Sequence, residues 1–264
     1  SAGNFPMPQL MRNTGVIYTL ETALKMLLEY QVIFLGEQHD SSAAHEAELG
    51  LLTGLYSLDS NLALAMEMFE RDVQEILNAY LEGKISEAAF REQSRPWNNY
   101  PEAYRPLIEF SKFKGIPVIA ANVPRRAAGA VSRANRISPE VLGSDAIYLP
   151  EKPPFRSRRY CELFKAAVQD MPAGPMGQIK PQALFKAQIL KDAVMAASIE
   201  AFLDRRILFC CGHFHSDYHL GIPYQLKKVH PGIKIAVIAM ASALETVPMK
   251  MLSRLADFFW IPDE

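Results

Sequence analysis

Glutamate and histidine side chains follow two apolar runs of this sequence at a spacing suited to metal binding or proton transfer. The two pairs are Glu37 with His39, after "VIFLG" (32–36), and His213 with His215, within and after "ILFCCGH" (207–213). On extended backbone, residues two apart point to the same side. Each pair also ends a Gly-x-x-His tetrapeptide, and its glycine lets the backbone approach a ligand closely.

Two further apolar runs carry polar groups near their ends. Glu67 lies in "LALAMEMF" (62–69), and Asn122 ends "IPVIAAN" (116–122) just before two arginines. A carboxylate inside an apolar run needs partners, because an unpaired buried charge is costly. A purely structural cluster of hydrogen-bonded polar groups would also give this carboxylate its partners, so that alternative stays open.

Imidazole and carboxylate groups together suit zinc, manganese or iron. We expect such an ion to be held by His39, Glu67, His213 and His215, with Glu37 free to act as a general base on metal-bound water. His45 follows His39 by six residues, on a predicted helix, and is left outside this set. His219 and His230 are expected on the surface or in loops.

The apolar runs are predicted to be strands of a mostly parallel sheet, since each is apolar on both alternating faces. A fifth run is "IKIAVIAM" (233–240). Between the runs lie helical patterns, at 21–30, 42–58, 102–114 and 181–203. Alternating strands and helices indicate an α/β protein in which helices flank the sheet. In such sheets, ligands bind at the carboxyl ends of the strands.

We expect one domain over residues 1–264, with a core at about 30–245 and helical elaborations at about 70–115 and 124–205. The segment "MPAGPMG" (171–177) is expected to be a mobile loop, an apolar contact surface or an ordinary exposed connector. A net charge of -1 argues against a nucleic-acid-binding surface. Three cysteines, two of them adjacent, do not form a disulfide framework.

Five blocks in order resemble the ChaN family of bacterial iron-regulated, haem-binding proteins. They are "FLGEQHD", "AMEMF", "RPWNNYPEAYRPLIEFSKFKGIPVIAANVPRR", "FKAQILKDAVMA" and "GHFHSDYHLGIP". The resemblance implies a haem-uptake protein whose haem lies at or near a homodimer interface with tyrosine ligation. It also implies a periplasmic or lipid-anchored location, and an outer-membrane haem receptor is an expected partner.

The wider superfamily includes the TIKI metalloproteases and is similar to erythromycin esterases. By that similarity, Glu37, His39, Glu67 and His215 would form a hydrolytic site, whereas His213 lies where relatives vary. A metal-dependent esterase or peptidase is therefore the alternative to haem binding.

Haem binding requires an axial ligand, an apolar cleft and cations for the propionates. Positive charge favours the ionised phenol of a tyrosine ligand. We expect Tyr160, which follows three arginines in "RSRRY", as the ligand and Tyr104 as the second choice. Further candidates are Tyr148 and Tyr218 as ligands, and Arg95, Arg105, Arg125 and Arg126 as cations.

Overall fold

The computed structural model describes residues 7–170 and 179–263, so the segment 171–177 lies outside the described residues. Its centre is one eight-stranded sheet with the strand order β2-β1-β8-β7-β3-β6-β4-β5. The strands are β1 (Gln9–Arg12), β2 (Ile17–Thr19), β3 (Val32–Glu37), β4 (Leu62–Glu70), β5 (Val118–Asn122), β6 (Arg206–Gly212), β7 (Ile235–Met240) and β8 (Phe258–Ile261). The five predicted strands correspond to β3 to β7, which confirms the α/β class.

The six strands from β8 to β5 in this order pair in parallel, whereas β1 pairs antiparallel with β8 on one side and with β2 on the other. The strands β1, β2 and β8 were not predicted. They have three or four residues each, and β1 and β2 are only partly buried. Strands this short carry little of the hydrophobic periodicity by which a strand is identified, and the exposure of β1 and β2 weakens it further.

The central strands are buried on both faces, with alternate residues facing two different cores. On β3, Ile33 and Leu35 belong to one core, and Val32 and Phe34 to the other. The adjacent cysteines of β6 divide in the same way, because successive strand side chains point to opposite faces. This explains why the runs read as continuous apolar sequence.

Twelve α-helices surround the sheet in the described part of the chain. They are α1 (Leu20–Leu27), α2 (Ser42–Leu58), α3 (Gln74–Leu81), α4 (Glu87–Gln93), α5 (Tyr100–Ala103), α6 (Arg105–Lys114), α7 (Arg125–Ala134), α8 (Pro139–Leu142), α9 (Arg158–Gln169), α10 (Pro181–Ser198), α11 (Ile222–Val229) and α12 (Met249–Leu255). The predicted helix at 102–114 is two helices, α5 and α6, and the one at 181–203 ends at Ser198.

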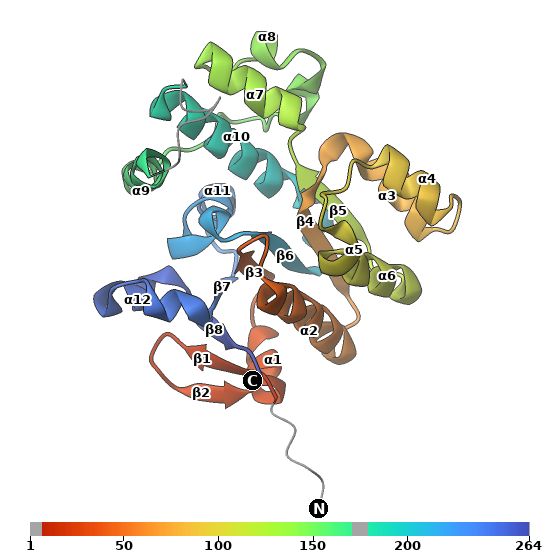
Figure 1. Cartoon of the computed structure of the whole chain (residues 1–264), viewed down its shortest axis with the longest axis vertical. Coiled ribbons are helices and arrows are strands. Elements are labelled where there is room, and N and C mark those ends of the chain that lie inside the picture. Colours follow the sequence, from red (N-terminus) through yellow and green to blue (C-terminus); the bar gives the residue numbers. More distant parts are fainter. Residues whose placement is uncertain (1–6, 171–178, 264) are drawn as a thin grey trace, which may run out of the picture.

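The two segments predicted to be helical elaborations hold α3 to α6 and α7 to α10. Side chains of α1 to α6 belong to the first core, whereas α10, α11 and α12 pack on the second. Figure 1 shows α7, α8, α9 and α10 gathered at one end of the molecule, opposite the β1–β2 hairpin. No helix in the described ranges has the length and apolar character needed to cross a bilayer.

Candidate functional site at the carboxyl edge of the sheet

The two Gly-x-x-His segments meet because β3 and β6 are parallel neighbours, with Glu37 in register with Gly212. A side chain added at Gly36 would lie 2.8 Å from the His213 Cα atom, and one added at Gly212 would lie 2.9 Å from the His39 Cε1 atom. At Gly36 a side chain would meet the backbone of the other segment, so the close approach requires this glycine, whereas at Gly212 it would meet the side chains of His39 and Glu67. The structure brings Glu37, His39, Glu67, His213 and His215 together at this edge.

A buried chain of charged groups forms one half of the site. The Glu67 carboxylate accepts a hydrogen bond from the backbone N–H of Gly212 at 2.7 Å and lies 3.3 Å from Nε2 of His215. The other ring nitrogen of His215, Nδ1, lies 2.6 Å from Oδ1 of Asp192 on α10. Both ring nitrogens thus face carboxylates. Only a doubly protonated imidazolium has an N–H donor for each of them.

The charges of this chain stabilise one another. Burial favours the neutral form of His215, but the charges of Glu67 and Asp192 prevail and raise its pKa to about 10. Burial would raise the pKa of Glu67, but the charge of His215 lowers it to about 2. For Asp192 burial prevails, and its pKa is raised despite the same partner. His215 is therefore held as a cation and has no lone pair for a metal ion.

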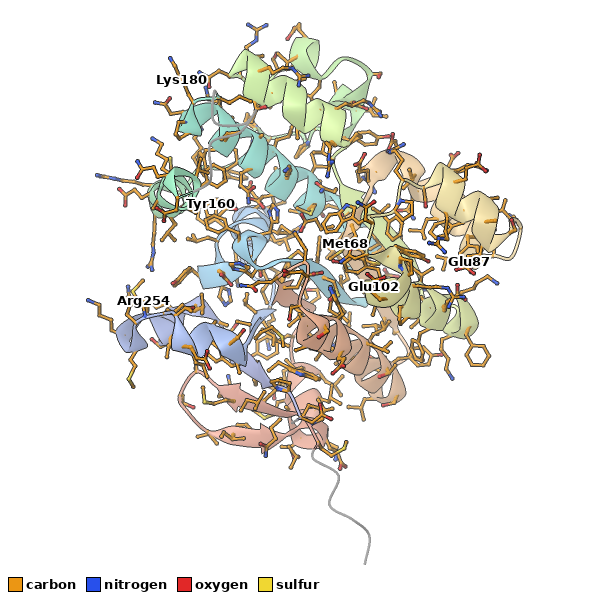
Figure 2. The ribbon with its side chains drawn as sticks, in the orientation of Figure 1. Met68, Glu87, Glu102, Tyr160, Lys180 and Arg254 are labelled. Atoms are coloured by element: carbon orange, nitrogen blue, oxygen red, sulfur yellow. The ribbon has the colours of Figure 1, made fainter. Side chains whose placement is uncertain are left out.

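Tyr160 belongs to this chain and is buried, pointing from α9 towards the interior (Figure 2). Its hydroxyl donates to Asp192 at 2.8 Å and accepts from the side-chain amide of Gln188 at 3.0 Å. Burial and the neighbouring Asp192 charge raise the pKa of Tyr160 well above its usual value. The arginines that precede Tyr160 in the sequence were expected to favour its ionised form, but burial and Asp192 favour the neutral phenol. A tyrosine binds haem iron as the ionised phenol, so this environment opposes ligation by Tyr160.

The other half of the site is built around Glu37, whose side chain is fully buried. Its two carboxylate oxygens lie 2.9 and 3.0 Å from the hydroxyl of Tyr104, which donates to them. Burial and the charge of Glu37 raise the pKa of Tyr104, so this tyrosine also stays a neutral donor. On its other side, Glu37 lies 3.4 Å from Nδ1 of His39.

His39 is half exposed and packs edge-on against Trp97, with ring centroids 4.7 Å apart. Burial lowers its pKa, but the hydrogen bond to Glu37 and the charge of Glu67 outweigh this and raise it. His39 is thus an accessible imidazole between the two halves of the site.

His45 was left outside the predicted set, but it reaches the site from α2. Its Nδ1 atom lies 2.9 Å from Glu48 and 3.8 Å from Glu37, and its Nε2 atom lies 2.9 Å from the backbone oxygen of His39. Among the described residues, the three side chains that could together hold a metal ion are Glu37, His45 and Glu48. The predicted metal set of His39, Glu67, His213 and His215 is not such a group.

His213 differs from His215 because it points outward. Nearly half of its side chain is exposed, and Nδ1 lies 2.7 Å from Oδ2 of Asp217. The hydrogen bond to Asp217 raises the pKa of His213. When Nδ1–H donates to Asp217, the Nε2 lone pair of the neutral ring is available to a ligand.

A cavity of about 500 Å³ lies over this edge of the sheet. It is lined by polar groups of the β3 and β6 ends, including His39 and His213. It is also lined by apolar side chains, namely Phe164, Ala167 and Val168 of α9 and Phe214. We call it the strand-edge cavity. Its size and mixed lining are typical of a small-molecule site.

The predicted cations separate into two groups. Arg95, Arg125 and Arg126 line a neighbouring cleft of about 680 Å³ together with Trp97, which we call the arginine cleft. Arg105 lines neither cavity and pairs instead with Glu87, at 3.1 Å from Nη2 to Oε2. Of the other proposed tyrosines, Tyr218 is half-buried, with the Arg159 guanidinium 5.0 Å from its ring centre, and Tyr148 faces Arg71.

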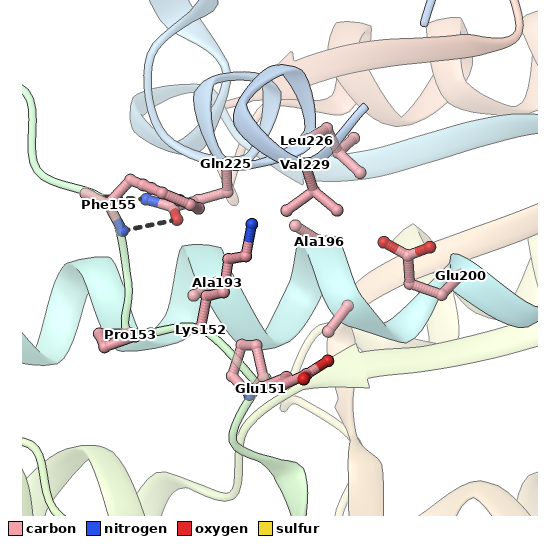
Figure 3. Close-up of a pocket in the computed structure, with 12 residues that line it drawn as sticks. Glu151, Lys152, Pro153, Phe155, Ala193, Ala196, Glu200, Gln225, Leu226 and Val229 are labelled. Atoms are coloured by element: carbon pink, nitrogen blue, oxygen red, sulfur yellow. Dashed lines mark hydrogen bonds between the residues drawn. The ribbon is translucent and has the colours of Figure 1, made fainter. Parts of the chain in front are cut away.

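A separate cavity of about 330 Å³ lies between α10, α11 and the segment 150–155 (Figure 3). Its lining is mainly apolar, with Lys152 extending into the space shown in the figure. It contains no histidine, cysteine or tyrosine side chain, so it lacks the usual haem-iron ligands.

Several residues of the site were missed by the sequence prediction. They are Asp192, Glu48, Asp217 and Gln188. The signal for Asp192 was a carboxylate within the apolar stretch "LKDAVMAA" of a helix. For Glu48 it was a position three residues after His45, which shares a helix face with it.

A family model described as haem-binding uptake, Tiki superfamily, ChaN matches residues 23–226. The solved structure titled "Cofacial heme binding to ChaN of Campylobacter jejuni" has 16% sequence identity and a TM-score of 0.77, over 97% of both chains, which shows the shared fold. The curated protein RETICULATA-RELATED 5, chloroplastic, of Arabidopsis thaliana is 22% identical over 89% of this chain, which spans about a third of that relative (34%). Because the family model covers more than half of its length, this chain belongs to the ChaN family of haem-binding uptake proteins in the Tiki superfamily.

Proposed function

We propose that this protein binds haem in the strand-edge cavity, with Nε2 of His213 as the axial ligand. Family membership supports haem as the ligand class. The observation that supports the site is that an accessible imidazole, that of His213, and apolar side chains, those of Phe164 and Val168, line one cavity. A porphyrin requires both an iron ligand and apolar surface.

The donor set fits the group. The carboxylate of Asp217 on Nδ1 orients the His213 ring and makes Nε2 more basic, as carboxylates commonly do behind metal-bound histidines. His215 cannot serve, because both of its nitrogens face carboxylates. When bound, haem would supply an iron centre that exchanges ligands and electrons, and this chain's residues would hold and orient it.

Tyr218 is the tyrosine whose surroundings suit ligation better than those of Tyr160 or Tyr104. The Arg159 guanidinium lies near its ring and works against the rise in its pKa that burial causes. We keep Tyr218 as the alternative ligand, with Tyr160 and Tyr104 as hydrogen-bond donors to Asp192 and Glu37.

We assign Arg125 as the cation for a propionate. It lines the arginine cleft and makes no ion pair with any described residue, whereas Arg95 and Arg126 are each paired with Asp72. The two cavities are linked through the contact of His39, which lines the first, with Trp97, which lines the second. A haem propionate would therefore meet an unpaired cation, Arg125, beside the strand-edge cavity.

Haemin titration tests the proposal. We expect saturable binding at micromolar haemin or below, with a spectrum typical of histidine ligation, and at least tenfold weaker binding by His213→Ala. The matched control is His230→Ala, because His230 makes a similar histidine–carboxylate pair, with Glu200, away from the cavity. If Tyr218→Phe rather than His213→Ala removes the iron–ligand signature, Tyr218 is the ligand. Absence of saturable binding by the wild type would refute haem binding here.

We further propose that the haem-loaded protein is a homodimer that takes part in iron acquisition, receiving haem from an outer-membrane receptor in the periplasm or at a membrane surface. The family resemblance supports this role, while the chloroplastic relative suggests a plastid as the alternative location. Light scattering with and without haemin tests the dimer. We expect the mass to double on loading, and an unchanged mass would contradict the dimer without affecting haem binding.

Hydrolysis is the second candidate function. It is favoured by the contact of Glu37 with Nδ1 of His39, since this carboxylate orients an imidazole that is half exposed at the cavity. Such an imidazole can accept a proton from water or a substrate. A hydrolytic role predicts esterase or peptidase turnover that is lost in His39→Ala and His215→Ala. Equal residual turnover in both variants and the wild type would exclude it.

A further inference from the structure

We propose that Glu37, His45 and Glu48 form a buried binding site for a divalent transition-metal ion, Zn²⁺ in the first instance. It lies beside the proposed haem site and does not depend on haem. The ligand atoms come from the end of β3 and the first turns of α2. One atom from each of the three side chains lies within 4.8 Å of the other two.

The spacing is close to that of an occupied site. Two ligand atoms that are each about 2.1 Å from one zinc ion can be at most ~4.2 Å apart. His45 Nδ1 already lies 2.9 Å from Oε1 of Glu48 and 3.8 Å from Oε2 of Glu37. Small side-chain rotations are therefore enough to bring all three onto one ion.

The tautomer of His45 prepares it for coordination. Nε2 lies 2.9 Å from the backbone oxygen of His39, and a carbonyl can only accept, so Nε2 carries the hydrogen. Nδ1 faces the two carboxylates, to which it presents a proton when the ring is charged and a lone pair when the ring is neutral. Such an arrangement needs a cation between them, either a proton or a metal ion. Metal-bound histidines commonly donate their other N–H to a backbone carbonyl in this way.

Glu48 supplies an independent indication. It is fully buried, and its Oε2 atom has no hydrogen-bond partner among the described residues. The Cys210 thiol, a weak donor, lies near this carboxylate. A buried polar atom without a partner is costly, and in native structures it often marks an absent ion or water. Glu48 therefore points to a ligand that completes its coordination.

The charge balance favours a dication. Glu37 and Glu48 are two buried carboxylates, and neither contacts a lysine or arginine in the described part of the chain. Two buried carboxylates need a positive partner, and without a metal ion they have only the histidines beside them, His39 and His45. One divalent ion neutralises both, with neutral His45 as the third ligand. Imidazole with carboxylates is a donor set that suits zinc.

A route to the site exists on the α2 side. His45 is about one-tenth exposed and lines a cavity of about 550 Å³ together with Ser42, Glu46 and Asn99. An ion can reach Nδ1 through a rotation of this ring. Tyr104 packs edge-on against His45, with ring centroids 5.0 Å apart, and its hydroxyl holds Glu37 in place.

Zinc titration by calorimetry tests the site, using chelator-treated, haem-free full-length protein. We expect one tight Zn²⁺ per chain, with protons released as His45 and Glu48 give them up. The variants Glu48→Gln and His45→Gln should each bind at least tenfold more weakly. The matched control is Glu46→Gln, because Glu46 lies on the same helix but is exposed. His213→Ala should bind zinc as the wild type does, which separates this site from the haem ligand.

Two results would overturn the proposal: no zinc binding by the wild type, or undiminished binding by Glu48→Gln. Loss of the tight zinc in His213→Ala would also overturn it, since it would place the ion in the strand-edge cavity. If a variant fails to fold, X-ray absorption of the zinc-loaded wild type decides. We expect oxygen and nitrogen neighbours in the first coordination sphere, and a shell of several sulfur or imidazole ligands would contradict the assignment.

Discussion

Nδ1 of His215 lies 2.6 Å from Oδ1 of Asp192, and both side chains are buried. Glu67 lies on the other ring nitrogen at 3.3 Å. A histidine between two carboxylates is an ion triad rather than a metal ligand. This relationship separates the roles of the two neighbouring histidines, since His215 stabilises the edge of the sheet and His213 remains accessible to a ligand.

The triad should make stability depend on pH. The folded-state pKa of His215, about 10, is above its usual value of 6.5, so its contribution is complete below pH 6.5 and is lost as pH rises towards 10. The folded-state pKa of Glu67, about 2, is below 4.5, so its contribution is complete above pH 4.5 and is lost as pH falls towards 2. Both contributions are complete between about pH 4.5 and 6.5.

Urea unfolding from pH 5 to 9.5 measures this dependence. We expect the difference in unfolding free energy between wild type and His215→Gln to be largest near pH 5 to 6 and to shrink at alkaline pH. At its largest it should be about 3 kcal/mol, the usual cost of breaking a buried ion pair. His230→Gln removes an exposed histidine–carboxylate pair and should change stability by less than about 1 kcal/mol throughout. A His215→Gln difference that grows with pH would contradict the assignment of His215 as a cation.

Asp217→Asn should weaken haem binding about 10- to 100-fold, the usual effect of removing a partner behind a metal ligand. It should also raise the reduction potential of the bound haem, because an amide makes the His213 ring a weaker donor to ferric iron than a carboxylate does. Haemin titration and spectroelectrochemistry measure the two effects. Glu200→Gln, which alters the His230 pair, is the control and should leave both unchanged. An unchanged potential in Asp217→Asn would indicate that His213 does not bind the iron.

The sheet and the meeting of its two Gly-x-x-His segments could be predicted from the sequence. The strands β3 to β7 are buried along most of their length, so their apolar runs are continuous, and parallel pairing places their ends together. The strands β1, β2 and β8 could not be predicted in this way, because runs of three or four residues are too short to show a pattern and β1 and β2 are only partly buried.

Which groups pair in the site could not be predicted where the partners come from helices far away in the sequence. Asp192 and His215 are separated by 23 residues, and Tyr104 and Glu37 by 67. The position of Tyr160 after three arginines suggested a charged environment, but the helix turns the phenol inward, away from them. Local sequence indicates which residues are polar, whereas tertiary packing decides which of them meet.

Tyr104→Phe should cost about 1–3 kcal/mol of stability, because it leaves the buried carboxylate of Glu37 without this donor. The haem spectrum should not change, since this phenol is a hydrogen-bond donor rather than an iron ligand. Tyr56→Phe is the control, because its hydroxyl makes only a 3.5 Å contact with the Lys114 carbonyl. Thermal unfolding and the Soret maximum are the two measurements. A changed Soret band in Tyr104→Phe alone would restore Tyr104 as a candidate ligand.

Gly36→Ala should destabilise the protein by about 1–3 kcal/mol, the usual cost of overpacking. The new methyl group would lie 2.8 Å from the His213 Cα atom and 2.7 Å from Oγ of Ser216, and the backbone of the neighbouring segment cannot give way cheaply.

Gly129→Ala is the matched control. Gly129 lies inside α7, where a methyl group would meet only the flexible Arg133 side chain, so this change should stabilise by about 0.5–1 kcal/mol. Because Gly36→Ala displaces His213 as well, it should also weaken haemin binding, whereas Gly129→Ala should not. Equal stability of the two variants would show that the close approach of the β3 and β6 ends is not required by the fold.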